Sequence, residues 1–252
     1  MRSDLAENNW KTLKDEPVEL VILPWGATEA HNYHLPYGTD NYQVEAISSE
    51  AVARANKEGA RAVVLPGIPF GVNTGQTDIR LTINILPSTQ YRILYDVIEN
   101  LDRHGIRKLV IMNGHGGNDF KQQIRELNHH FPAMFISVSQ WFKLPGKEEF
   151  FSEPGDHADE SETSLMMYLK PELVLPLEEA GDGSFKKMKI DAFNQGWSWA
   201  ERKWTKVTAD TGIGNPKLAT REKGKIYFEY LVKNYCDFFL ELSRLDLNDM
   251  YR

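Results

Sequence analysis

Acidic and imidazole side chains gather in one short segment of the chain. Residues 29–40 contain Glu29, His31, His34 and Asp40, directly after an apolar run. Glu29 and His31 are two positions apart, so in an extended backbone their side chains point to the same side. Carboxylate oxygen and imidazole nitrogen are ligands that zinc, manganese and iron accept. The segment therefore predicts a metal site, with a solvated polar loop as the alternative.

Two further clusters favour the metal site. A glycine-rich turn around His115 (residues 113–118) follows the apolar run 108–112, and glycines let the backbone turn sharply and approach a ligand closely. The acidic segment 156–164, which contains His157, opens a helical pattern. Four of the seven histidines fall in these three segments, which chance would not produce.

The elements that must position these clusters alternate along the chain. Strand-like apolar runs span residues 18–24, 61–67, 107–112 and 133–139. Helical patterns span residues 41–57, 87–104, 118–131, 159–169 and 217–243. Thr39 or Asp40 is placed to cap the first of these helices. The alternation predicts an α/β fold, with a mostly parallel central sheet and helices on both faces, and chemistry in the loops at the carboxyl ends of the strands.

Composition limits the classes of function. A chain of 252 residues with 41% hydrophobic and 26% charged residues is typical of a soluble enzyme, and we expect one domain over residues 1–252. A net charge of −7 argues against nucleic acid or an anionic membrane as partner. No apolar run is long enough to span a membrane, and the amino terminus lacks the pattern of a signal peptide. The single cysteine, Cys236, is expected to be a small core residue, and its isolation fits a reducing compartment, so we expect a cytoplasmic location.

Four motifs, in order, resemble those of the creatininase family of metal-dependent amidohydrolases. They are the Glu-x-His-x8-Asp pattern of residues 29–40, the Asn-Gly-His-Gly-Gly-Asn turn of 113–118, the His-Ala-x-Glu-x-Glu-Thr-Ser segment of 157–164, and residues 219–224 before the last helix. The resemblance covers most of the chain. It implies a creatininase-like α/β/α sandwich, a small-molecule amide substrate, and a homo-oligomer, by resemblance a hexamer.

The resemblance also implies a dinuclear centre of two divalent ions, zinc, manganese or iron, that share a bridging hydroxide. By position, Asp40 is the carboxylate that bridges both ions. Glu29 and His115 complete the ligands of one ion, and His31 begins those of the other. Such a centre hydrolyses an amide at neutral pH.

The fifth metal ligand departs from the family pattern. Creatininase itself has a metal-binding glutamate at the position of Gly117 and an apolar residue at the position of Glu160. This exchange predicts Glu160 as the replacement ligand and a member of the catalytic site, since it shares a helix face with His157 if that turn is already helical. Glu162 is the alternative ligand; otherwise it caps backbone amides or supports the ligands from outside.

His157 resembles the catalytic histidine of the family. A neutral imidazole there would pass a proton to the departing nitrogen, with Asp156 orienting it, whereas the alternative is a simple helix cap. Trp141 matches a substrate-facing tryptophan of the family, although a strand-end aromatic in the core is equally compatible with the sequence. His34 is expected to line the substrate pocket or to bond a ligand.

The substrate is less well specified than the metal site. Residues 151–155 lack the tryptophan that covers creatinine in creatininase, and residues 71–78 differ from the usual family loop. We expect hydrolysis of a C–N bond in a small cyclic amide or a formamide-type substrate. The alternatives are a non-catalytic metal-binding or ligand-binding protein and a mononuclear zinc hydrolase acting on small peptides. Residues 171–216, with three tryptophans, are compatible with a subunit interface, a flap over the site or a satellite aromatic cluster.

Overall fold

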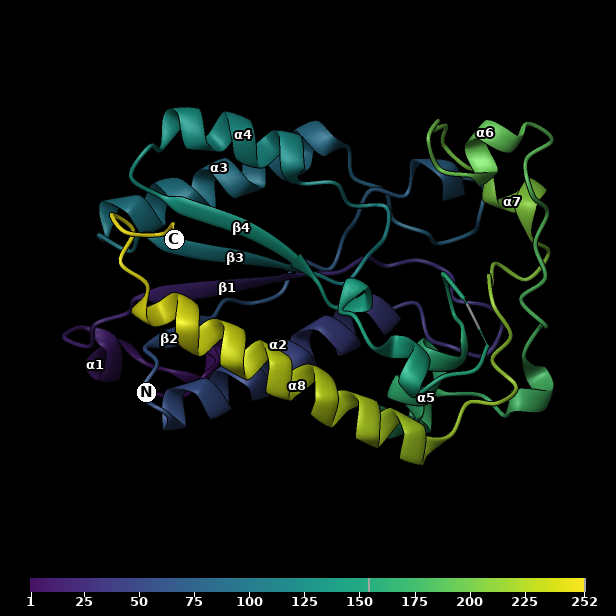
Figure 1. Ribbon diagram of the computed structural model, residues 1–252, viewed down its shortest axis with the longest axis horizontal. Helices are drawn as coiled ribbons and strands as arrows, with labels where there is room; N and C mark the ends of the chain where they lie inside the picture. The colour runs from purple at the N-terminus through teal and green to yellow at the C-terminus, as the bar shows by residue number, and fades with distance from the viewer. Residues whose placement is uncertain (154, 252) are drawn as a thin grey trace.

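The computed structural model describes residues 1–153 and 155–251. Within these residues a four-stranded sheet runs in the order β2-β1-β3-β4, and every neighbouring pair is parallel (Figure 1). The strands are β1 (Leu20–Trp25), β2 (Ala62–Val64), β3 (Lys108–Asn113) and β4 (Phe135–Gln140). All four predicted strands are present, although β2 ends at Val64 rather than at residue 67.

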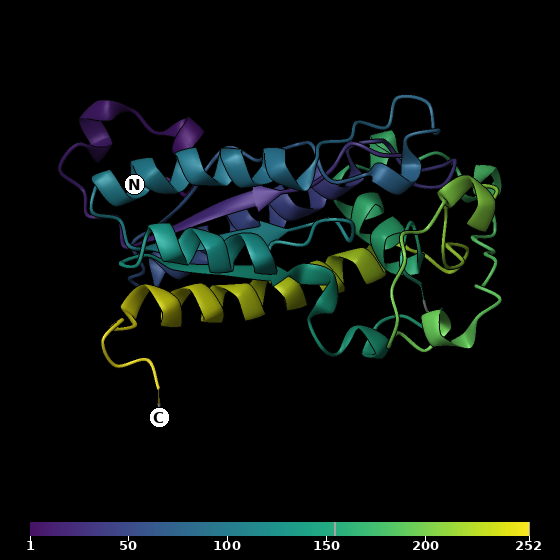
Figure 2. The same cartoon turned by 90° about the horizontal axis from the view of Figure 1, so that it is seen from above.

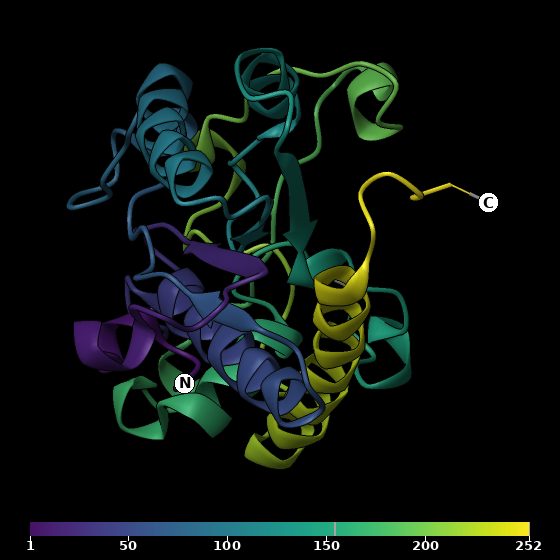
Figure 3. The same cartoon turned by 90° about the vertical axis from the view of Figure 1, so that its left-hand side faces the viewer.

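Helices cover both faces of the sheet. One face packs against α2 (Thr39–Lys57) and α8 (Arg221–Arg244), which also contact each other, and α5 (Glu160–Leu169) packs against both helices. The other face packs against α3 (Pro87–Arg103) and α4 (Lys121–His130) (Figures 1 and 3). Alternate strand residues serve the two layers, as the two-residue period of a strand requires. Ile22 lies in the first core and Leu23 in the second. The predicted α/β fold is confirmed.

The remaining elements are short. Single turns of α-helix are α1 (Trp10–Leu13), α6 (Asp191–Asn194) and α7 (Trp204–Val207). Turns of 3₁₀-helix occur at Leu5–Glu7, Thr74–Gln76, Trp141–Lys143, Lys147–Glu149, Pro171–Leu173 and Leu177–Glu179. Figure 2 shows that the segment carrying α6 and α7 lies beyond the ends of the strands, on the side to which their arrowheads point.

The start of α2 differs from the capping prediction. Gly38 is the N-cap residue, and α2 receives no side-chain cap there. The Thr39 hydroxyl donates to the carbonyl of Pro36 (2.7 Å) instead. Asp40 therefore lies in the first helical turn, where its carboxylate is free to face the loops beyond the sheet.

Two other expectations can be compared with the structure. Cys236 is buried on α8 in the first core, so the core role is confirmed. None of the helices in the described part of the chain combines the length and the apolar character needed to cross a membrane.

Candidate metal centre

The loop after β1 carries Glu29 and His31 into the protein interior. Both side chains are fully buried, and His31 forms a β-bridge with Leu35 that folds the loop back on itself. Asn32, at the turn, has a left-handed backbone (φ 54°), which asparagine tolerates better than most residues. The side-chain oxygen of Asn32 accepts a hydrogen bond from the backbone of Gly181 (2.8 Å). The loop is thus fixed by local folding and by a distant segment.

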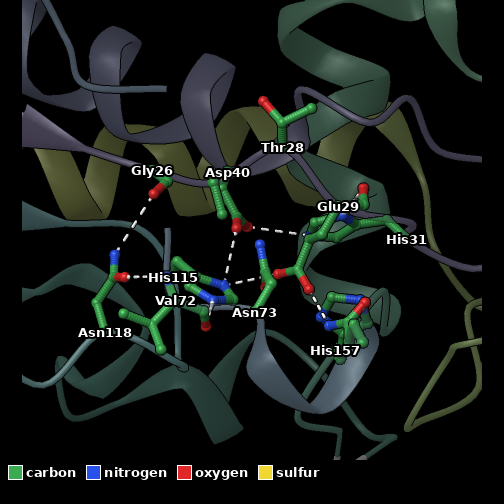
Figure 4. A network of polar contacts seen from close by, with 12 residues as sticks. Gly26, Thr28, Glu29, His31, Asp40, Val72, Asn73, His115, Asn118 and His157 are labelled. Atoms are coloured by element: carbon green, nitrogen blue, oxygen red, sulfur yellow. Dashed lines mark hydrogen bonds and ion pairs between the residues drawn. The ribbon is translucent and has the colours of Figure 1, made fainter. Parts of the chain in front are cut away.

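Asp40 stands between two histidines. Its Oδ1 lies 3.0 Å from His31 Nε2, and its Oδ2 lies 3.2 Å from His115 Nδ1 (Figure 4). Each oxygen of the one carboxylate therefore faces a different imidazole. This is the access from two sides that a bridging carboxylate needs.

The glycine-rich turn after β3 delivers His115 to the same place. Asn113 Oδ1 accepts from the backbone N–H of His115 (3.1 Å), and Asn113 Nδ2 donates to its carbonyl (2.8 Å). A Cβ at Gly114 would meet the Asp40 carbonyl at 2.9 Å, so glycine permits this close approach. His115 Nδ1 then lies 2.6 Å from Glu29 Oε1.

Backbone carbonyls fix the imidazole tautomers. His115 Nε2 donates to the carbonyl of Val72 (3.1 Å), and His31 Nδ1 donates to the carbonyl of Glu29 (3.2 Å). In a neutral ring the other nitrogen therefore carries the lone pair. In both residues that nitrogen faces the carboxylates. Such N–H to carbonyl support is characteristic of histidines that ligate metal.

Two carboxylate oxygens at the centre, one from Glu29 and one from Asp40, lack a hydrogen-bond partner among the described residues. Glu29 Oε1 and Asp40 Oδ2 are buried and accept no hydrogen bond with acceptable geometry from the described residues, although His115 Nδ1 is close to both. Glu29 Oε2, in contrast, accepts from the side-chain amide of Gln76. Buried charge without partners is costly unless a cation completes it. Two orphaned oxygens beside two imidazole lone pairs fit a divalent ion of the zinc, manganese or iron type.

The histidines and the carboxylates of the centre shift each other's pKa values. Burial opposes the charge of His31, but Asp40 raises its pKa to about 10. Burial likewise opposes the charge of His115, but Glu29 and Asp40 raise its pKa well above the usual range. The pKa of Asp40 is lowered, because His31 and His115 outweigh the burial. The protons on the two imidazoles therefore supply the positive charge that an ion would otherwise bring.

Of the two glutamates considered from the sequence, the structure brings Glu162, and not Glu160, close to Asp40 and His31. Ligand atoms of His31, Asp40 and Glu162 lie within 4.8 Å of one another. Burial, and then Asp40, raise the pKa of Glu162 to about 8 although His31 lowers it. Glu160 instead pairs with Lys223 and accepts from the backbone N–H groups of Ser152 (3.1 Å) and Glu153 (3.0 Å). The structure therefore does not bring Glu160, the ligand and catalytic residue predicted from the sequence, to the other predicted ligands.

The physical reason is that α5 begins at Glu160, three residues after His157, whereas a shared helix face needs His157 to be in the helix. Ala158 has a left-handed backbone (φ 51°) and Asp159 is the N-cap, so His157 lies outside the helix. The side chains of His157 and Glu160 therefore do not share a helix face. Instead, the backbone N–H of Ala158 donates to Glu162 Oε2 (2.5 Å), which turns that carboxylate toward the centre.

Gly117 can supply no ligand here, as the sequence indicated, and the structure also shows that no side chain fits. A Cβ at Gly117 would collide with the carbonyl of Val72 and with the His115 ring. The space that a glutamate would need is filled by the hydrogen bond that orients His115. Glycine at 117 and Glu162 as the remaining acid are thus parts of one arrangement.

His157 adjoins the centre from the α5 side. Its ring centroid is 4.1 Å from that of His31, and its Nε2 donates to the carbonyl of Ala30 (2.9 Å). Ligand atoms of Glu29, His31 and His157 also lie within 4.8 Å of one another. Burial, and then His31, lower the pKa of His157. Asp156 bonds Arg202 (2.7 Å) and thus does not orient the His157 ring directly.

The two residues predicted to bind substrate, His34 and Trp141, are buried and do not belong to the groups of candidate ligands. His34 Nε2 bonds the hydroxyl of Thr163 (2.9 Å), and its Nδ1 has no hydrogen-bond partner among the described residues. Trp141 is fully buried in the first core and packs against Phe142, so the structure supports the alternative of a strand-end core aromatic. Part of the segment 151–155 is also placed: Phe151 is buried, whereas Pro154 lies outside the described residues.

Sequence reasoning missed two contributors to the centre. Gln76 contacts Glu29 from the loop after β2, and no spacing pattern marks it, although the loop's departure from the family pattern drew attention to it. The segment around residues 181–213 also adjoins the centre: Ile213 forms a β-bridge with His157, and Thr211 accepts a hydrogen bond from the backbone of Asn32 (2.9 Å). Only a glycine-rich, tryptophan-containing composition hinted at this role.

A parallel sheet with buried acids and histidines beyond the carboxyl ends of its strands defines an α/β enzyme with a candidate metal centre. The family model described as creatinine amidohydrolase matches residues 6–239. The chain belongs to the creatininase family of hydrolases. It is 27% identical to the creatinine amidohydrolase of Pseudomonas putida, over 86% of this chain and 87% of the relative. It is 25% identical to the mycofactocin precursor peptide peptidase of Mycolicibacterium smegmatis, over 87% of this chain and 84% of the relative.

Solved structures of creatininase-type proteins have the same fold as this chain. A Bacteroides fragilis NCTC 9343 protein, described provisionally as a creatinine amidohydrolase, superposes with a TM-score of 0.92 at 41% identity, and the match covers 100% of both chains. A creatininase mutant solved in a "Zn-Zn type" form superposes with a TM-score of 0.81 at 24% identity, over 97% of this chain and 100% of that one. The second likeness, at 24% identity, supports the fold alone.

Proposed function

We propose that this chain is a dinuclear metal-dependent amidohydrolase that hydrolyses the C–N bond of a small amide. One ion would be held by Glu29, Asp40 and His115, and the other by His31, Asp40 and Glu162. When bound, such ions polarise a carbonyl and lower the pKa of water, which amide hydrolysis at neutral pH requires.

The observation that carries the proposal is the position of Asp40. Its two oxygens face His31 and His115 separately, and an acid stands on each side: Glu29 beside His115 and Glu162 beside His31. Two ligand groups therefore share one carboxylate. A mononuclear site would need only one of these groups, so the arrangement favours two ions over the mononuclear alternative.

His157 is placed to move a proton. Its Nε2 is occupied by the carbonyl of Ala30, so its Nδ1 is the atom that can take up and release a proton. In the metal-free protein, burial and then the charge of His31 lower the pKa of His157, so the ring is neutral at pH 7 and Nδ1 can accept a proton. A purely metal-binding protein would not need a buried neutral imidazole beside the ligands, which argues against the non-catalytic alternative.

The substrate is left open by the relatives, because the names of two of them refer to creatinine and to a precursor peptide. A screen with creatinine, a formamidopyrimidine and short peptides, run with the metal-loaded protein and after chelation, tests the proposal. We expect turnover of one substrate, its loss on chelation and its return when zinc or manganese is added. Turnover that survives complete metal removal would contradict metal dependence, and no turnover in any arm would favour a binding protein.

The remaining expectations stand as parts of the same proposal. We expect one domain over residues 1–252 and a cytoplasmic homo-oligomer, by resemblance to the family a hexamer. Light scattering coupled to size-exclusion chromatography measures the assembly directly. A monomeric mass would contradict it.

A further inference from the structure

One tryptophan of the segment 181–213 contacts the candidate centre. The Trp204 ring, on α7, meets the His157 ring edge-on, with centroids 4.8 Å apart. Trp197 and Trp199 of the same segment are 75% and 84% exposed, whereas Trp204 is half-buried. The three tryptophans therefore differ in role, and only Trp204 adjoins a residue of the site.

Contacts of Arg202 and Thr205 hold Trp204 in place. The guanidinium of Arg202 lies over its ring, 5.1 Å from the centroid, and also donates to Asp156 Oδ2 (2.7 Å), the residue before His157. On the other side, the hydroxyl of Thr205 donates to Asp78 (2.5 Å) in the loop after β2. Arg202 thus connects the Trp204 ring to the loop before α5, and Thr205 connects α7 to the loop after β2. The ring itself contacts His157.

The centre behind this ring is closed. Glu29 and His31 are fully buried, and His157 is only 7% exposed. An amide substrate must therefore reach these groups past side chains that now cover them. The Trp204 ring covers His157, and the surface contacts of Arg202 and Thr205 hold it there.

From this we infer that Trp204 is a substrate-contacting, specificity-determining residue that covers His157 and limits the size of the amide admitted beside it. The Arg202–Asp156 ion pair positions it. This inference rests on the proposed hydrolysis, and residues 151–155 offer no tryptophan for the same task. A flat aromatic wall favours small planar amides, and its removal should favour bulkier ones.

The test compares Trp204→Ala and Trp204→Phe with the matched control Trp199→Ala, which removes an exposed tryptophan from the same segment. We expect Trp204→Ala to change the ratio of kcat/KM for a small cyclic amide to that for a short peptide by about tenfold or more, in favour of the peptide. Trp204→Phe should restore most of the ratio, and Trp199→Ala should leave it unchanged. An unchanged ratio in an active Trp204→Ala variant, or an equal change in Trp199→Ala, would overturn the inference.

A second readout separates this inference from the proposed function. The rate at which diethyl pyrocarbonate modifies His157, followed by peptide mass spectrometry, reports how well that ring is covered. It should rise about tenfold in Trp204→Ala and not in Trp199→Ala. If the wild type hydrolyses nothing, the proposed function fails and the substrate role of Trp204 fails with it. The modification rate of His157 still tests whether Trp204 covers that ring. An unchanged rate in Trp204→Ala would overturn the covering contact.

Discussion

Two groups of buried acids lie close together in this molecule, and they have different partners. Asp159 pairs with Lys147 (2.7 Å), and Glu160 pairs with Lys223. Glu29, Asp40 and Glu162 have no lysine or arginine within 4.0 Å in residues 1–153 and 155–251, and the basic side chains that approach them are histidines.

The difference separates acids that support the fold from acids that support the chemistry. Asp159 caps α5 by accepting from the backbone of Ser161 and Glu162, and Glu160 ties residues 152 and 153 to α5. Their charges are neutralised by fixed lysines. The acids of the centre are instead balanced by imidazoles, which can give up their protons to an incoming ion. A buried acid without a permanent cation is therefore the better marker of function, and the following changes test that distinction.

The largest effect is expected for Asp40→Asn, which removes the shared charge of the centre. Even a partner outside the ligand set contributes about 10–100-fold to metal affinity or activity, so loss of the shared ligand should lower kcat/KM by more than about a hundredfold. Steady-state kinetics on metal-supplemented protein measure this. An Asp40→Asn variant with near wild-type kcat/KM would remove Asp40 from the site.

The paired changes Glu162→Gln and Glu160→Gln test the comparison most sharply. Glu162→Gln should weaken metal binding about 10–100-fold while the metal-free protein keeps its stability, because burial raises the pKa of Glu162 to about 8 and glutamine therefore replaces a carboxyl that is already protonated at neutral pH. Glu160→Gln should retain metal but lose about 1–3 kcal/mol of unfolding free energy, because Lys223 and two backbone N–H groups lose a charged acceptor. Competition with a metal chelator and denaturant melts provide the two values. The opposite assignment of effects would restore Glu160 as the ligand.

The position of His115 can be tested with two neighbouring glycines. Gly117→Ala would push its Cβ against the carbonyl of Val72 and the His115 ring, so metal affinity should fall about tenfold. Gly116→Ala is the matched control, since a Cβ there meets nothing within 4 Å. Equal affinities in the two variants would show that the orientation of His115 does not matter for binding.

The metal-free protein should also show a pH-dependent stability. Burial opposes the charge of His31, but Asp40 raises its pKa from 6.5 to about 10. The stabilisation from this proton is complete below about pH 6.5 and is lost as the pH rises toward 10. Denaturant melts of the metal-free protein should therefore show falling stability over this range. The metal-loaded protein, in which His31 ligates as a neutral ring, should keep its stability, so parallel pH profiles would contradict the assignment.

Much of this arrangement was predictable from the chain alone. The four apolar runs predicted the strands, and because parallel strands end at one edge, they also predicted that the loops holding Glu29, Asp40 and His115 would meet. The family motifs then supplied the expected division of ligands. These steps depend on local pattern and on one topological rule, so they transfer well from sequence to structure.

The parts that sequence did not predict depend on details without a local signal. The left-handed backbone of Ala158 brings Glu162 rather than Glu160 toward the centre. Alanine rarely adopts this conformation, so the sequence gives no sign of it. The contact between Trp204 and His157 joins segments far apart in the chain, through a loop with no periodic pattern. Such contacts arise only once the whole chain is packed.

The most direct test of the central claim is the number of metal ions per chain, measured by inductively coupled plasma mass spectrometry after equilibrium dialysis against zinc or manganese. If the acids without permanent cations hold metal, the wild type and Glu160→Gln should bind close to two ions, and Asp40→Asn close to none. A wild type that binds none, or an Asp40→Asn variant that still binds two, would contradict the account.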